Sequence, residues 1–108
     1  MAEQTTETPV LDLLAKMTTD SIEASSLDEE TLMLVRIAAL VAVDAPPVSY
    51  MLNIGAAGDI GIDAEKVRGV FAAVAPIVGT ARIASATGKI VRATGLAMEM
   101  AELEEETS

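Results

Sequence analysis

The sequence predicts an all-α protein. Apolar residues recur at the three-to-four spacing of helices in five segments, and no segment alternates as a strand does. The 108 residues suffice for one domain, expected to span residues 1–108. Hydrophobic residues make up 51% of the chain and aromatic residues only 2%. A folded core built from Ala, Val, Ile, Leu and Met is therefore expected.

The first two helices are expected over 9–18 and 27–43, after a frayed acidic end at 1–8. Pro9 suits the first turn of a helix. The side chains at helical spacing in this first segment are Val10, Leu11, Leu14 and Met17. Ser26 and Glu29 fit a capping box for the second helix. That helix is apolar nearly all round, which predicts a central position.

Proline and glycine predict where the next two helices begin and end. Pro46 and Pro47 end the second helix and open a third over 47–58, which a glycine-rich turn closes at 58–61. Asp63 is a suitable N-cap for a fourth helix over 64–75, on which Val67, Val70, Phe71 and Val74 line the inner face.

The last helix is expected over 81–104, with a second frayed acidic end at 105–108. Pro76 is expected to break or kink the preceding helix, and Thr80 to cap the last one. One stripe of the last helix is expected to be buried, namely Ile83, Ala86, Ile90, Ala93, Ala97 and Met100. Another face carries Arg82, Lys89 and Arg92, which either capture an anionic ligand or form a solvated or ion-paired surface.

Residue types exclude several kinds of chemistry. The chain has no cysteine and no histidine, so it has no disulfide, no thiol redox centre and no nucleophile–histidine pair. No metal and no cofactor are expected. The glycines lack the spacing of a dinucleotide fingerprint, and Thr87-Gly88-Lys89 lacks the remainder of a phosphate loop. Asp59 and Asp63 fit a turn and a cap better than a calcium loop.

Charge and hydropathy indicate the class of partner. The net charge is −10, distributed as −7 over residues 1–30, +2 over 31–98 and −5 over 99–108. Nucleic acid is therefore not an expected partner. No stretch is long enough to span a membrane and no signal peptide is recognisable, which predicts a cytoplasmic protein. With a mean hydropathy of +0.42, the chain has more apolar side chains than a small monomer can bury. This predicts a homo-oligomer rather than a monomer with an unusually apolar surface.

The stretch 44–61 is the most promising place for a small-molecule site. It is uncharged from residue 45 to residue 58 and brings together the polar side chains of Ser49, Tyr50 and Asn53. Arg36, the one charge within an apolar helix, either needs an acidic or carbonyl partner or binds an anionic group of a ligand.

The order of segments resembles the carboxymuconolactone decarboxylase family, which includes the alkylhydroperoxidase D proteins. The resemblance covers about residues 10–100. It depends on Leu27-Asp28, on the run GIDAEKV over 61–67 and on the run APIVGTAR over 75–82. The family implies an all-α subunit that assembles as a trimer or hexamer.

The chemistry of that family does not carry over to this chain. Counting back from Gly61 places Pro46 and Ser49 at the two reactive cysteines and Asn53 at the histidine. The family's glutamate falls near Met33 or Leu34, so a cysteine-based peroxidase is excluded.

Three hypotheses about function follow. The first is a noncatalytic, oligomeric small-molecule-binding member, in which Ser49, Tyr50 and Asn53 supply polar contacts and Arg36 binds an anionic group. The second is a decarboxylase or isomerase without a redox step, acting on a small carboxylate or lactone. Tyr50, Asp44 or Asp59 would then transfer protons. The third is a structural or protein-interaction module that uses its acidic ends.

Overall fold

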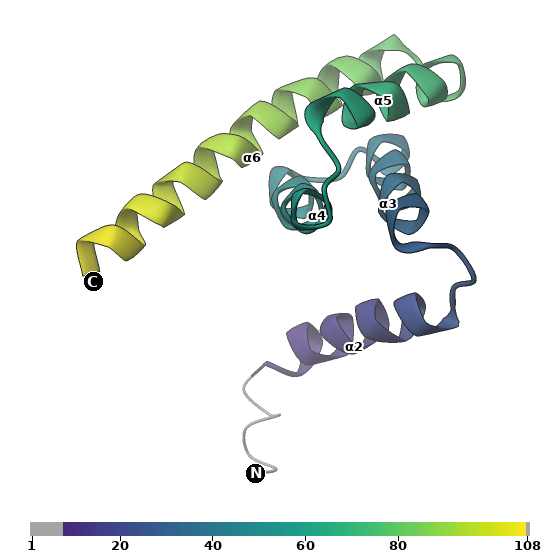
Figure 1. The fold of residues 1–108 in the computed structure, drawn as a ribbon. Helices are drawn as coiled ribbons and strands as arrows, with labels where there is room; N and C mark the ends of the chain where they lie inside the picture. The colour runs from purple at the N-terminus through teal and green to yellow at the C-terminus, as the bar shows by residue number, and fades with distance from the viewer. Residues whose placement is uncertain (1–7, 108) are drawn as a thin grey trace.

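The computed structural model describes residues 8–107, and within them the chain is entirely helical between its turns (Figure 1). The five helices are α2 (Pro9–Ala24), α3 (Glu29–Val43), α4 (Pro47–Asp59), α5 (Ala64–Val78) and α6 (Thr80–Thr107). The described residues contain no strand, which confirms the all-α prediction. The expected frayed ends fall largely on residues 1–7 and 108, outside the described part, whereas residues 105–107 continue α6.

Helix α3 lies at the centre, as its apolar sequence predicted. It packs against α4, α5 and α6, and its Ile37 and Val41 side chains are fully buried. Two apolar clusters surround it. One joins Ile37 to Ala57 and Ile62, and the other joins Val41 to Tyr50 and to the small residues of α6. The short side chains of α6 allow the helices to approach closely in this aromatic-poor core.

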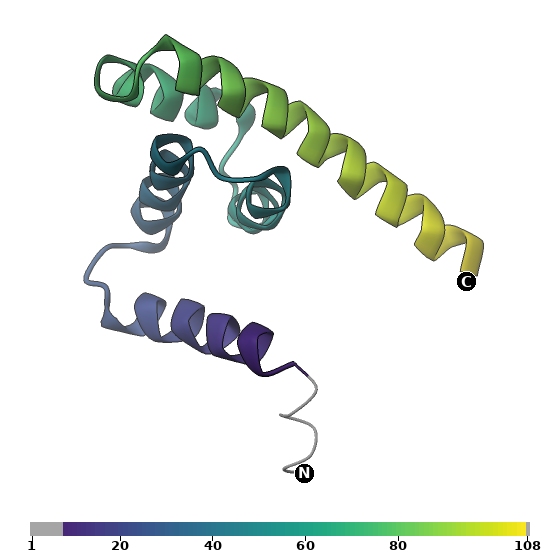
Figure 2. The ribbon, with the colours of Figure 1, turned by 180° about the vertical axis from the view of Figure 1, so that it is seen from behind.

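Only the first half of α6 is buried along the expected stripe. Ala86 and Ala93 are buried, but Ala97 is exposed and Met100 is 54% exposed, so the prediction is wrong for these two residues within one subunit. The reason is geometric. The second half of α6 extends beyond the other helices in both ribbon views, where no helix of the same chain can cover it (Figures 1 and 2).

Helix α2 is longer than predicted and lies apart from the core. It continues to Ala24, and the hydroxyl groups of Thr18 and Thr19 donate to the carbonyls of Leu14 and Ala15, one turn earlier. None of its residues is buried. The apolar stripe that predicted this helix therefore has little cover from the rest of the subunit.

The predicted capping box at Ser26 is wrong, because α3 begins later. Asp28 is the N-cap, with extended backbone, and its Oδ1 accepts a hydrogen bond from the Thr31 N–H at 2.8 Å. Glu29 is therefore the first helical residue and cannot reach back to close a box.

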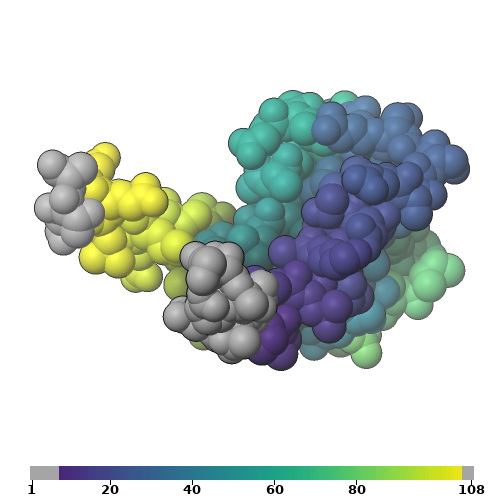
Figure 3. Space-filling view, turned by 90° about the horizontal axis from the view of Figure 1, so that it is seen from below, coloured from purple at the N-terminus to yellow at the C-terminus, as the bar shows by residue number. Residues whose placement is uncertain are grey.

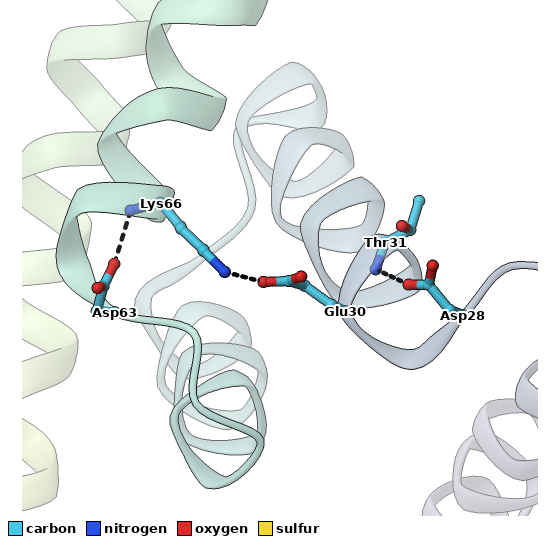
Figure 4. A network of polar contacts seen from close by, with 5 residues as sticks. All are labelled: Asp28, Glu30, Thr31, Asp63 and Lys66. Atoms are coloured by element: carbon cyan, nitrogen blue, oxygen red, sulfur yellow. Dashed lines mark hydrogen bonds and ion pairs between the residues drawn. The ribbon is translucent and has the colours of Figure 1, made fainter.

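The predicted N-cap at Asp63 is confirmed, since its Oδ1 accepts from the Lys66 N–H at 3.0 Å. The side chain of Lys66 also pairs with Glu30, which joins the starts of α3 and α5 (Figure 4). Two adjacent helix starts are thus fixed by local caps and by one ion pair between them.

The predicted break at Pro76 is also wrong. Helix α5 passes through Pro76 to Val78, and the chain reverses at Gly79, where φ is +89°. Pro76 has no N–H to donate to the carbonyl of Ala72, but the backbone stays helical, and the reversal falls at Gly79 because a positive φ favours glycine. Thr80, expected as a cap, is the first residue of α6.

No helix within residues 8–107 combines the length and the apolar character that crossing a membrane requires.

We expect Ile37→Ala to lower the free energy of unfolding by about 2–5 kcal/mol, because the residue is fully buried and a cavity would remain. Urea denaturation measures this loss. Val35→Ala on the same helix is the matched control, since Val35 is 52% exposed. Equal losses in the two variants would contradict the central placement of α3.

We expect Asp28→Ala to lower the melting temperature by roughly 4 °C, because it removes the cap of α3. Ser26→Ala should leave the melting temperature unchanged, because the structure gives Ser26 no capping role. Thermal unfolding followed by circular dichroism compares the two. A larger effect at Ser26 would restore the capping box and refute the observed start of α3.

Candidate functional site

Tyr50 is the most unusual polar residue of the core. It lies in the first turn of α4, where Pro47 opens the helix and Pro46 holds the extended backbone before it. Its side chain is fully buried among Val41, Ala45, Ala86 and Ala93. The hydroxyl makes no hydrogen bond to any residue that the structure describes. A buried hydroxyl without a partner lowers the stability of the fold by about 1–3 kcal/mol, so a new hydrogen bond to this group would be favourable.

A small apolar cavity lies beside Tyr50, between α4 and α6. Its volume is about 180 Å³, and its lining residues are Tyr50, Met51, Ile54, Gly55, Ile90, Ala93, Thr94 and Ala97. All of the lining residues come from one face of each of the two helices. The packing of α4 on α6 therefore forms the cavity.

A wider groove adjoins this cavity and shares Ile54, Ile90 and Thr94 with it. It has a volume of about 480 Å³ and continues between α4, α5 and α6 to Asp63 and Arg68. Together the two spaces form an apolar path along α4. Tyr50 lies toward one end of the path, and Asp63 and Arg68 lie toward the other.

Arg68 is available for a ligand at the far end of this path. Its guanidinium makes no ion pair with a described residue. The carboxylate of Asp63, which also lines the groove, already accepts the capping hydrogen bond from Lys66. A ligand with a negative group can therefore reach a free cation here.

Ser49 and Asn53, which the sequence grouped with Tyr50, do not line the cavity beside it. Both are half-buried, and the Asn53 Nδ2 donates to the Ser49 carbonyl at 2.9 Å within α4. Residues 49 and 53 are one helical turn apart and lie on one face of α4, whereas the cavity is lined by residues 50, 51, 54 and 55. The side-chain amide of Asn53 thus supports its own helix in this structure.

Arg36 is directed toward α2. Its Nη2 donates to the Thr18 carbonyl at 3.4 Å and to the Ser21 hydroxyl at 3.1 Å. The carbonyl partner that the sequence required is therefore present. Arg36 does not line the cavity of Tyr50 or the adjoining groove.

A polar cluster at the end of α3 was not foreseen from the sequence. Asp44 adopts a left-handed backbone with φ of 56°, and its carboxylate accepts from Ser85 at 2.7 Å and from Lys89 at 2.8 Å. The Lys89 ammonium also donates to the Asp44 carbonyl at 3.1 Å. One lysine of the predicted cationic stripe is thus committed to holding α3 against α6.

These contacts change how two titratable groups behave. The hydrogen bonds from Lys89 and Ser85 lower the pKa of the Asp44 carboxyl, which makes it a weaker base. Burial and the nearby Asp44 charge raise the pKa of the Tyr50 phenol, which therefore stays protonated near neutral pH. The phenol is suited to donating a hydrogen bond rather than to accepting a proton.

The residues that the sequence missed are those that line the path between the helices. Ile54, Ile90 and Thr94 fall on inward-facing positions of α4 and α6, and their spacing gave only the general signal of helix burial. Within the described residues, no group of three or more potential metal ligands comes together.

No protein-family model matches the chain, no curated protein matches it, and no solved structure matches it. The resemblance to the carboxymuconolactone decarboxylase family therefore stays a prediction.

We expect Asp44→Asn to lower the melting temperature at pH 7, because the folded chain stabilises the ionised carboxylate. The folded-state pKa is below the ordinary value of 3.8, so this stabilisation is complete above that value and is lost as the pH falls through the lower folded-state pKa. Melting curves of the variant and the wild type should converge in strong acid.

A double-mutant cycle with Lys89→Met gives the control for Asp44→Asn. At pH 7 the double variant should lose less stability than the two single variants lose together, and in strong acid the effects should simply add. Additive effects at pH 7 would show that the cluster does not hold α3 against α6.

Proposed function

We propose that the chain is a noncatalytic small-molecule-binding protein, and a divergent member of the carboxymuconolactone decarboxylase family without thiol redox activity. The observation that carries the proposal is Tyr50, which lines an apolar cavity and whose buried hydroxyl bonds to no described residue, so that a small movement of the side chain would present it to a ligand. Binding sites for small molecules are mostly apolar, with a few polar groups that orient the ligand. The path along α4 has this character.

The dimensions of the path favour an elongated apolar ligand. The cavity and the groove together fall within the range of about 300–1,000 Å³ that is usual for small-molecule sites. A hydrogen-bond acceptor at one end of the ligand would satisfy the Tyr50 hydroxyl. A carboxylate at the other end would pair with Arg68. The proposed ligand class is thus an apolar monocarboxylate with a distal acceptor group.

The structure gives less support to the alternative, a decarboxylase or isomerase without a redox step. Of the expected proton-transfer groups, Asp44 is held in contact with Lys89 and Ser85, and its lowered pKa weakens it as a base. Tyr50 is buried and protonated. A binding role requires neither Asp44 nor Tyr50 to transfer a proton.

The test compares ligand-dependent melting of wild type, Tyr50→Phe and Arg68→Ala, with 4-methoxycinnamate and 10-hydroxydecanoate as probes, because each has a carboxylate and a distal acceptor. We expect at least one probe to raise the wild-type melting temperature. Loss of one hydrogen bond or ion pair should weaken its binding about tenfold in each variant. Without the probe, Tyr50→Phe should melt at or above the wild-type temperature, because no protein partner loses a hydrogen bond.

Ser49→Ala is the matched control, since Ser49 lies on another face of the same helix turn. It should retain wild-type affinity. Equal weakening by Ser49→Ala and Tyr50→Phe would shift the site to the face of Ser49 and Asn53. A probe that binds all variants alike would remove this path from consideration.

A further inference from the structure

The chain exposes more surface than a compact protein of its mass should. Its accessible surface is 7539 Å², whereas a compact monomer of 11.2 kDa exposes about 5,700 Å². Eight residues can expose at most about 160 Å² each, even when fully unfolded. After that deduction for residues 1–7 and 108, the described residues expose at least about 6,260 Å², which is roughly 900 Å² more than the about 5,350 Å² of a compact 100-residue chain. A standard protein interface buries about 800 Å² per partner, so the excess equals one missing interface.

Helix α2 exposes much of the apolar surface of the subunit. Six of its large apolar side chains are between 50% and 66% exposed: Val10, Leu11, Leu13, Leu14, Met17 and Ile22. Hydrogen bonds from Arg36 to Thr18 and Ser21 hold the helix to α3. Figure 3 shows α2, in purple, on the face of the molecule that is seen from below.

The second half of α6 carries a further apolar stripe. Leu96 and Met100, four residues apart, are 40% and 54% exposed, and they continue the line of the buried residues Ala86 and Ala93. This part of the helix, in yellow, extends away from the body in Figure 3. A stripe that is buried at one end and exposed at the other lacks a second helix along its exposed part.

Charge excludes two classes of occupant for these faces. The net charge of −10 and the acids at both ends oppose an anionic membrane surface or nucleic acid. The same net charge also repels a second copy, so the apolar faces must supply the attraction and added salt should strengthen association. Among the described residues, Arg82 and Arg92 make no ion pair, and neither do Asp12 and Glu23 of α2. A second copy supplies arginines to unpaired acids and acids to unpaired arginines.

We propose that a second copy of this chain covers the apolar faces of α2 and of the second half of α6. Every copy carries both faces, which suits the closed symmetry of homo-oligomers. The acids of α2 in one subunit then approach the arginines of the other. The inference depends on surface area and charge and is independent of any ligand at Tyr50.

The test measures molar mass by light scattering and by sedimentation over a concentration series. Wild type should exceed the monomer mass of 11.2 kDa at micromolar concentration. Leu14→Glu/Met17→Glu and Leu96→Glu/Met100→Glu should each weaken association at least a hundredfold, because each buries two carboxylates in the contact.

Matched controls place negative charge on the opposite faces. Lys16→Glu in α2, which lowers the net charge by two as the double variants do, and Met98→Glu in α6 should keep the wild-type mass, since these residues are exposed on the other side of each helix. A monomeric wild type at all concentrations would overturn the proposal. So would controls that dissociate as readily as the apolar-face variants, or apolar-face variants that keep the wild-type mass.

Hydrogen exchange of the wild type provides a test that does not depend on variants folding. Backbone amides of α2 should exchange slowly in concentrated protein and at least tenfold faster after dilution below the association midpoint. Fast exchange of α2 at every concentration would overturn the proposal. The ligand tests at Tyr50 remain valid in either case, so the two proposals fail separately.

Discussion

Burial of α3 is the constraint on which the rest of the structure depends. This helix is apolar on nearly every side, so no single neighbour can cover it, and α4, α5 and α6 together surround Ile37 and Val41. The two ends of α3 are fixed by polar contacts to other helices. Glu30 pairs with Lys66 of α5 at the start, and Asp44 binds Ser85 and Lys89 of α6 at the end.

The same constraint leaves two segments outside the core. Helix α2 does not cover the side of α3 that α4, α5 and α6 leave open, where Val35 stays 52% exposed, and it is held to α3 by hydrogen bonds from Arg36. Helix α6 has 28 residues and α4 has 13, so much of α6 has no partner of equal length. A small core with only two aromatic side chains, Tyr50 and Phe71, thus produces both a compact centre and uncovered apolar faces.

The candidate site arises from the packing of unequal side chains in the same core. Small residues of α6 such as Ala93 leave space against Ile54 of α4, and Tyr50 is buried at the edge of that space. The phenol contributes apolar surface to the core, while its hydroxyl remains unsatisfied. The unpaired hydroxyl lowers the stability of the folded chain, whereas in the proposed binding role the same hydroxyl would bond to a ligand.

The sequence by itself determined the helical class, the central position of α3 and the cap at Asp63, because these follow from local periodicity and short-range hydrogen bonds. It placed the other cap at Ser26 and a break at Pro76, since several residues near a helix end can serve and only the path of the chain selects among them. Tertiary structure alone decided that Arg36 binds α2, that Asp44 binds Lys89, and that Tyr50 rather than Ser49 or Asn53 lines a cavity. These outcomes depend on how each helix is oriented about its axis relative to its neighbours. The spacing of residues along one helix does not determine that orientation.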